Sequence, residues 1–381
     1  MEILHYTEDH EKFRRNLRDF LAQEVVPHVD QWEKDHIVPK SVWRKMGEAG
    51  FLCTAQPVEY GGHGLDFLYS VIVCEECSHT GFTGLTASLH SDIVVPYIES
   101  FGTEEQKKKY IPKCASGECI SAVAMTEPDV GSDLASMTTI ADDEGESFVI
   151  NGTKTFISNG INCGLCVVAA KDPQATNPYQ AISMFLVEDG TPGFGRGKHL
   201  EKMGWHSQDT AELFFSKCRI PKENLLGQKG GGFIILMQKL QQERLVCAIG
   251  AVCAAEKVVE KITEYCKNTK DRNGKPMSKN QATQFALVEM ATEAKIGRVF
   301  IDKLIADHME KKNVVVEVSM AKFWTTDLAK RTCDRALDIV GEPGYLEAFG
   351  LARGFRDVRV MPIFAGTNEI MKRIAAGFMG L

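Results

Sequence analysis

Apolar and polar positions follow a helical period over the first third of the chain. In "FRRNLRDFLAQEVV", Phe13, Leu17, Phe20 and Leu21 recur at intervals of three or four residues, and Pro27 is placed to end the helix. This pattern predicts an N-terminal α-helical domain over residues 1–118.

Between residues 119 and 225 the pattern changes to short runs rich in β-branched and aromatic residues. In "ESFVINGTKTFIS", the Asn151-Gly152 pair predicts the type I′ turn of a β-hairpin, because both residues tolerate positive φ. Further runs, "LCVVAA", "AISMFLVE" and "AELFFSKCRI", follow at the spacing of a sandwich or barrel. We therefore expect a middle β domain.

The helical period returns after residue 226 and continues to residue 381. One broad stripe contains Phe285, Val288, Ala291 or Leu287, Ile296, Val299 and Phe300, which predicts a helix facing the interior of a bundle. The expected fold is thus multi-domain α+β, with an N-terminal helical domain, a central β-barrel or sandwich domain, and a C-terminal four-helix bundle over residues 226–381.

Composition limits the functional classes. The chain has 381 residues, 51 acidic against 44 basic, and no basic block, so no nucleic-acid partner is expected. No stretch reaches the roughly 18 apolar residues of a membrane span, and the N-terminus does not resemble a signal peptide. We expect a cytoplasmic protein with no membrane partner, unless a targeting peptide has been removed.

The chain contains twelve cysteines, which suit a reducing compartment in a protein of this length. Two pairs have CxxC spacing, Cys74 with Cys77 and Cys163 with Cys166, but neither has a histidine or second pair nearby. The sequence therefore predicts buried thiols and no metal site.

Near the C-terminus, "FAGTNEIMK" predicts a tight turn followed directly by a helix. Gly366 allows a close backbone approach, and Thr367 or Asn368 is suited to cap the helix. The free N–H groups at such a helix start suit an anionic or carbonyl ligand.

Four motifs occur together and in order: "AMTEPDVGSD", "NGTKTFISNG", "RIPKENLLG" and "FAGTNEIMKRI". Together they resemble the acyl-CoA dehydrogenase family over essentially the whole chain. The resemblance implies an FAD cofactor, an acyl-CoA thioester substrate, a homotetramer, and an electron-transferring flavoprotein that accepts the electrons.

The resemblance also implies site residues. The backbone N–H of residue 365 is expected to donate to the thioester carbonyl, as an oxyanion hole does. Substrate contacts are predicted for Ser132, Arg244, Ala365 and Gly366. Cofactor contacts are predicted for Val123, Met125, Thr126, Gly131, Ser132, Phe156, Ser158, Lys270, Arg272, Gln281, Asp338, Thr367 and Glu369, and strand alternation is expected to place Phe156 and Ser158 on one face.

One position departs from the family pattern. Most members carry at position 365 a glutamate that removes the α-proton, and this chain has Ala365. Two other acids are candidates for the catalytic base. Glu243, on a long helix, matches the position of the catalytic base in relatives that also lack the loop acid. The alternative is that Glu243 faces solvent or pairs with Lys239. Asp92 lies at the start of an apolar helix that, by the resemblance, lines the acyl pocket; the alternative is that Asp92 is the N-cap of that helix.

The two acids imply different reactions, because a general base must reach its own proton. Asp92 is suited to remove a γ-proton from a thioester that is already unsaturated. The loss of the loop glutamate together with this pocket aspartate resembles the 1,4-eliminating cyclohex-1-ene-1-carboxyl-CoA dehydrogenase type of anaerobic metabolism. This reaction is our first interpretation. Glu243 suits ordinary α,β-dehydrogenation of a branched, alicyclic or longer acyl-CoA. A third interpretation is a catalytically silent flavin-fold binding or assembly protein.

Overall fold

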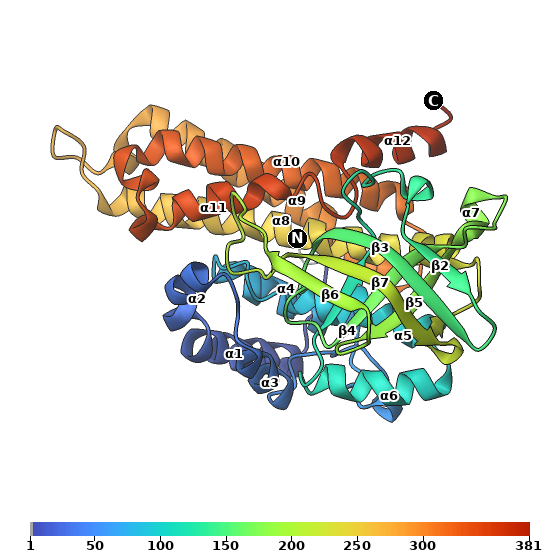
Figure 1. The fold of residues 1–381 in the computed structure, drawn as a ribbon. Helices are drawn as coiled ribbons and strands as arrows, with labels where there is room; N and C mark the ends of the chain where they lie inside the picture. The colour runs from blue at the N-terminus through green and yellow to red at the C-terminus, as the bar shows by residue number, and fades with distance from the viewer. Residues whose placement is uncertain (1–2) are drawn as a thin grey trace.

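The computed structural model describes residues 3–381 as helical, β-rich and again helical regions in succession (Figure 1). In the first region, α1 buries Leu17 and Leu21 and ends before Pro27, as predicted. The helices of this region are α1 (Glu8–Glu24), α2 (Val29–Asp35), α3 (Lys40–Glu48), α4 (Phe67–His79), α5 (Val95–Phe101) and α6 (Glu104–Ala115).

A π-helical turn, Leu89–Val94, leads directly into α5. Asp92 lies inside this turn and Ser88 precedes it as the N-cap residue, so the alternative that made Asp92 a helix cap is wrong. π-Helical turns are rare and are frequent at functional sites.

The middle region is one sheet with the strand order β6-β7-β3-β2-β4-β5-β8, and β1 pairs in parallel with β4. Phe148, Ile150, Val168, Phe185 and Leu213 belong to the core on one of its faces. The strands are β1 (Ser121–Ala124), β2 (Ile140–Asp143), β3 (Ser147–Ile157), β4 (Leu165–Lys171), β5 (Ile182–Glu188), β6 (Phe194–His199), β7 (Ala211–Pro221) and β8 (Leu225–Leu226), with the short helix α7 (Pro178–Ala181) before β5.

The hairpin predicted at Asn151-Gly152 is wrong, because β3 runs through both residues as one strand. Its register against β7 shifts between Ile150 and Gly152, which marks a β-bulge. A Cβ atom at Gly152 would lie 2.4 Å from the Thr139 hydroxyl oxygen, so glycine serves a close approach here and not a turn.

The C-terminal region packs α8 (Gly232–Asn268) against α4, α9 (Gln281–Met309) and α10 (Val315–Val340), while α11 (Leu351–Asp357) and α12 (Asn368–Phe378) contact α10. The predicted interior stripe of α9 is wrong in part: Phe285, Val288 and Ile296 are 60%, 64% and 56% exposed. α9 buries the opposite side, including Met290 and Ile301, against the bundle. The helix therefore has two apolar faces, and one of them points outward.

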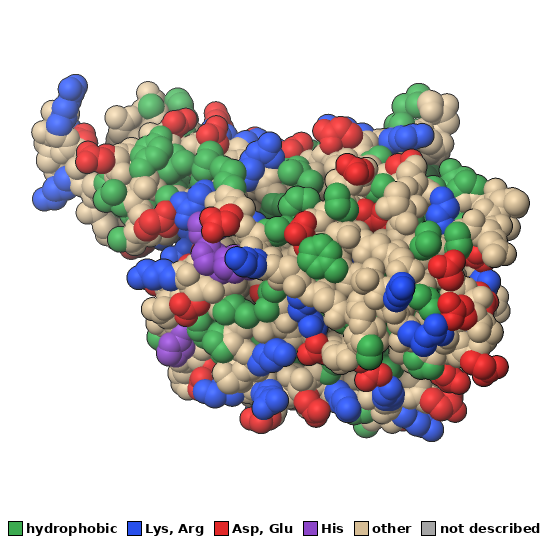
Figure 2. All heavy atoms as spheres, in the orientation of Figure 1, with side chains coloured by type: hydrophobic (Ala, Val, Ile, Leu, Met, Phe, Trp, Pro, Cys, Tyr) green, Lys and Arg blue, Asp and Glu red, His purple; other side chains and the backbone are tan. Residues whose placement is uncertain are grey.

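On the face shown in Figure 2, apolar side chains gather over the C-terminal bundle, and charged side chains of both signs intermix over the rest of the surface. Within residues 3–381, no helix has the length and apolar character that a bilayer crossing requires.

Candidate active site

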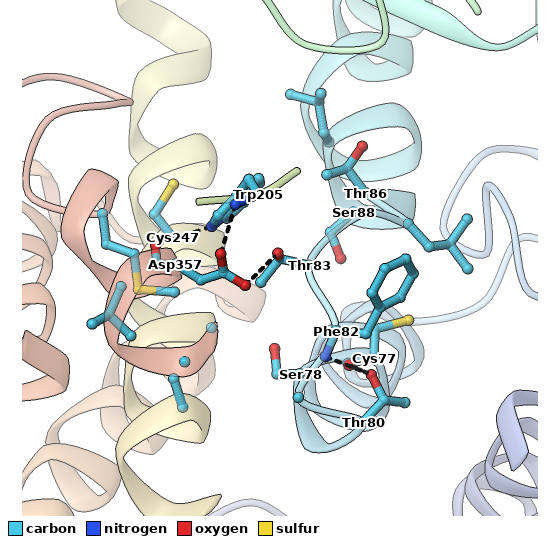
Figure 3. A pocket seen from close by; sticks show the side chains of 18 of the residues that line it. Cys77, Ser78, Thr80, Phe82, Thr83, Thr86, Ser88, Trp205, Cys247 and Asp357 are labelled. Carbon is cyan, nitrogen blue, oxygen red and sulfur yellow. Dashed lines mark hydrogen bonds between the residues drawn. The ribbon is translucent and has the colours of Figure 1, made fainter. Parts of the chain in front are cut away.

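A cavity of about 560 Å³ lies where the three regions meet. Its walls come from the connection between α4 and α5, the ends of β1 and β3, one side of α8, and the segment 347–365. Figure 3 shows Thr86 and Ser88 on one side of the cavity and Cys247 on the other, with the hydrogen-bonded Thr83 and Asp357 between them. Such a junction between domains is a frequent location for a ligand site. The predicted site residues that line it are Val123, Met125, Thr126, Phe156, Ser158, Glu243 and Ala365.

Phe156 and Ser158 both reach the cavity, but not through regular strand alternation. Phe156 has a left-handed backbone (φ 56°), and the register of β3 against β7 shifts between Lys154 and Ile157. As a result the Phe156 ring is 64% exposed on the cavity wall, where an aromatic ligand could stack.

A buried ion pair fixes the neighbouring wall. The Lys154 ammonium donates to the Met125 carbonyl oxygen (3.0 Å) and to Glu127 Oε1 (2.9 Å). Burial opposes the charge on Glu127, but the bonds from Lys154 and Thr138 outweigh it and lower the Glu127 pKa to about 2. The Met125–Thr126 segment is therefore held rigidly.

This wall fits a flavin. It offers an aromatic face at Phe156 and the hydroxyls of Thr126 and Ser158, which have no hydrogen-bond partner among residues 3–381. An isoalloxazine ring needs such a flat apolar contact together with donors at its polar edge.

The C-terminal loop contributes Ala365 to the same cavity. Thr367 caps α12, as predicted, with its hydroxyl accepting the Ile370 N–H at 3.2 Å. Ala365 and Gly366 have left-handed backbones (φ 54° and 92°), and Lys322 donates to the Gly366 carbonyl oxygen at 2.7 Å. The Ala365 N–H has no acceptor among the described residues, so it is available to a ligand carbonyl.

Glu243, on α8, is 8% exposed, and its Oε2 atom has no hydrogen-bond partner in residues 3–381. Burial raises its pKa to about 7, although the charges of Arg244 and Lys322 oppose the shift. The alternative pairing with Lys239 is wrong, since Glu243 is buried and the Lys239 ammonium donates to Ser100. A cavity carboxylate that ionises near neutral pH is suited to general base catalysis.

Models of the acyl-CoA dehydrogenase N-terminal, middle and C-terminal domains match residues 7–118, 122–218 and 230–380. The chain belongs to the acyl-CoA dehydrogenase family. The predicted fold is thereby confirmed, and so are the enzyme class, an oxidoreductase, and the cofactor, FAD.

Related proteins span different substrate sizes. This acyl-CoA dehydrogenase is 41% identical to the mouse (Mus musculus) long-chain specific enzyme, over 97% of this chain and 86% of that protein. It is 36% identical to the rat (Rattus norvegicus) short-chain specific enzyme, over 98% of this chain and 90% of that protein. The crystal structure of acyl-CoA dehydrogenase from Geobacillus kaustophilus superposes with a TM-score of 0.96 at 51% identity, covering 99% of both chains.

The second candidate base of this acyl-CoA dehydrogenase, Asp92, is 3% exposed. Burial raises its pKa to about 7, and the nearby hydroxyls of Ser70 and Ser88 offset part of the shift. Ser88 lines the cavity, but Asp92 is absent from the wall formed by the described residues. Asp92 therefore lies one layer behind the cavity surface.

Several predicted contact residues of the dehydrogenase lie outside the cavity wall. Arg244 is buried beside the C-terminal loop, with its Nη2 atom 4.0 Å from the position of a Cβ at Gly366, and it forms no ion pair within residues 3–381. The connection between α8 and α9 projects from the end of the bundle (Figure 1). The other residues outside the wall are Gly131, Ser132, Lys270, Arg272, Gln281, Asp338, Gly366, Thr367 and Glu369.

Thr83, Trp205 and Asp357 are among the cavity residues that the sequence did not reveal. They lie in three different regions of the chain, and hydrogen bonds join both Thr83 and Trp205 to Asp357 (Figure 3). The one available signal was a tryptophan in the polar segment "GWHSQD", which did not reveal its partners.

Proposed function

We propose that this acyl-CoA dehydrogenase oxidises a saturated long-chain acyl-CoA to the α,β-unsaturated thioester, with Glu243 as general base. The observation that carries the proposal is the buried Glu243 carboxyl, whose Oε2 atom has no partner within residues 3–381, in the wall of the cavity that also contains Ala365 and Phe156. Ala365 has no acidic group, and Glu243 supplies one at the same cavity.

The chain's own groups account for the proton transfer. The Ala365 N–H donates to the thioester carbonyl oxygen, which stabilises the negative charge that develops when the α C–H ionises. Glu243 then accepts the α-proton. When bound, FAD supplies the acceptor for the hydride that leaves the β-carbon.

Arg244 and Lys322 keep Glu243 usable as a base. Burial alone would hold the carboxyl protonated, and the two positive charges oppose that effect. Lys322 also bonds the Gly366 carbonyl oxygen, so one ammonium influences both the base and the loop that positions the substrate. Arg244 is buried and forms no ion pair within the described residues, and we assign it to polar groups of the CoA chain.

The shape of the cavity supports a long acyl group. Its α8 wall is a helical stripe that begins at Glu243, passes Val246, Gly250 and Ala254, and reaches Lys257. At 1.5 Å per residue this stripe is about 21 Å long. Because carbon–carbon bonds are about 1.5 Å, an extended chain advances about 1.25 Å per carbon, so the stripe accommodates on the order of 16 carbons.

A second candidate function is the 1,4-elimination of cyclohex-1-ene-1-carboxyl-CoA to the cyclic 1,5-diene, with Asp92 as base. The buried Asp92 carboxyl, close to the cavity residue Ser88, favours it. Its place behind the wall makes it the less favoured reading, since a base must come within about 3 Å of its proton or act through one water.

We further propose a homotetramer with an electron-transferring flavoprotein as electron acceptor. The outward apolar face of α9 and the apolar groove formed by Ile296, Phe300, Phe323 and Trp324 fit a second copy of the chain. The projecting loop with Lys270 and Arg272 would then bring positive charge to the FAD pyrophosphate of a neighbouring subunit.

Turnover against a panel of thioesters tests the proposal. Oxidised enzyme is mixed with palmitoyl-, butyryl-, isovaleryl-, cyclohexanoyl- and cyclohex-1-ene-1-carboxyl-CoA, and loss of the flavin absorbance is followed. We expect palmitoyl-CoA to bleach the flavin fastest. Bleaching by the cyclohexenyl ester alone would replace this function with the second candidate, and no bleaching by any ester would overturn both.

A further inference from the structure

Asp357, at the end of α11, connects the three regions of the chain inside the cavity. Its Oδ1 atom accepts the Trp205 backbone N–H at 2.6 Å, and its Oδ2 atom accepts the Thr83 hydroxyl at 2.9 Å. The Trp205 indole N–H donates to the Asp357 carbonyl oxygen at 3.0 Å. Asp357 is 3% exposed, and Figure 3 shows it between Trp205 and Thr83.

Trp205 links this cluster to the C-terminal loop. Its ring packs edge-on against Phe364 at a centroid distance of 5.4 Å, and Phe364 directly precedes Ala365. Trp205 and Ala365 both have left-handed backbones, with φ values of 53° and 54°. Non-glycine residues keep such conformations only where their surroundings enforce them.

We propose that Asp357 is a positioning residue for the dehydrogenation: it fixes Trp205, and through Trp205 and Phe364 it fixes the Ala365 N–H that receives the thioester oxygen. The inference rests on the proposed function, because it assigns that N–H to the substrate carbonyl. Asp357 acts at a distance from the reacting carbons. Its removal should therefore displace the carbonyl donor and impair the chemical step more than substrate binding.

The holoenzyme carrying Asp357→Ala tests the inference. With palmitoyl-CoA we expect kcat to fall about 10- to 100-fold, while KM changes by less than about 3-fold and FAD stays bound. Asp357→Asn keeps an oxygen for the Trp205 N–H and places an amide donor beside the Thr83 hydroxyl, so it should restore most of the rate.

Asp209 provides a matched control. Asp209 is 3% exposed, like Asp357, and burial raises the pKa of both carboxyls to about 6. The Asp209 carboxylate also accepts a backbone N–H, from Asn162 at 2.6 Å. Unlike Asp357, Asp209 does not line the cavity. Asp209→Ala should lower the melting temperature without changing kcat. An equal loss of kcat in both alanine variants, or an unchanged kcat in Asp357→Ala, would overturn the inference.

If Asp357→Ala does not fold, Thr83→Val decides, since it removes only the hydrogen bond to Oδ2. A several-fold loss of kcat supports the inference, and an unchanged kcat overturns it. If the wild-type enzyme oxidises none of the thioesters, the proposed function is overturned. This result differs from the results that would overturn only the role of Asp357.

Discussion

Glu243 and Ala365 show how far single residues could be interpreted from the sequence. The missing acid at position 365 was evident, and it directed attention to the two remaining carboxylates. Their relative position was not evident, because it depends on how α8 and the π-helical turn before α5 pack around the cavity. The Asp357 cluster was out of reach, since Thr83 and Asp357 are 274 positions apart.

The ionisation of Glu243 sets a pH dependence. The base must be deprotonated to act, so kcat/KM for a saturated acyl-CoA should rise with pH and level off above its pKa of about 7. Initial rates from pH 5.5 to 9 with the Asp92→Asn variant, which leaves Glu243 intact, should show the same rise. A flat profile across this range would contradict the assignment of Glu243.

The same group predicts a change in stability. Because burial raises the Glu243 pKa from 4.5 to about 7, the folded state binds the proton more tightly than the unfolded chain, and stability falls as pH rises through this window. Glu243→Gln avoids the loss and should be more stable than wild type at pH 8, by at most about 3 kcal/mol, and nearly equal at pH 5. Thermal unfolding of both holoenzymes at pH 5 and pH 8 measures this stability difference. A variant less stable than wild type at pH 8 would contradict the prediction.

At the scale of elements, irregular segments carry the site, and the sequence indicated them only partly. The cap of α12 by Thr367 was predictable because its signal is local. The bulge in β3 was predicted as a hairpin turn, because an Asn-Gly pair suits a bulge and a turn equally well. Only the close approach of Thr139 to Gly152 distinguishes the bulge from the turn.

The C-terminal loop gives a prediction at this scale. Gly366 has φ 92°, and a Cβ there would lie 2.7 Å from the Met371 methyl carbon, so Gly366→Ala should shift the loop that contains the Ala365 N–H. We expect kcat to fall by about 10-fold or more. Gly377→Ala, on α12 with open space around its Cβ, is the control and should be active and slightly more stable. Equal activity of both variants would remove the loop from the mechanism.

At the scale of the whole molecule, the three regions and their order were predictable because long periodic segments differ clearly between helix and strand. The outward apolar face of α9 was assigned to the interior, since a helical period reveals an apolar stripe without revealing what covers it. In the proposed tetramer a second copy of the chain covers this face.

Replacing that face tests the assembly. Val288→Lys and Ile296→Lys place charges on the exposed side of α9, where the native side chains are 64% and 56% exposed. Light scattering should report a smaller particle for the double variant than for wild type, because a buried unpaired charge opposes association. Glu310→Lys, on an exposed residue beyond the end of α9, controls for charge alone. An unchanged mass would place the interface elsewhere.

The choice of base is tested most directly by comparing Glu243→Gln with Asp92→Asn in the FAD-bound enzyme, with flavin reduction by palmitoyl-CoA followed in a rapid mixing experiment. We predict that Glu243→Gln slows reduction by about 10²- to 10⁴-fold while Asp92→Asn stays within a few-fold of wild type. The reverse order, or full activity of Glu243→Gln, would contradict Glu243 as the residue that removes the α-proton.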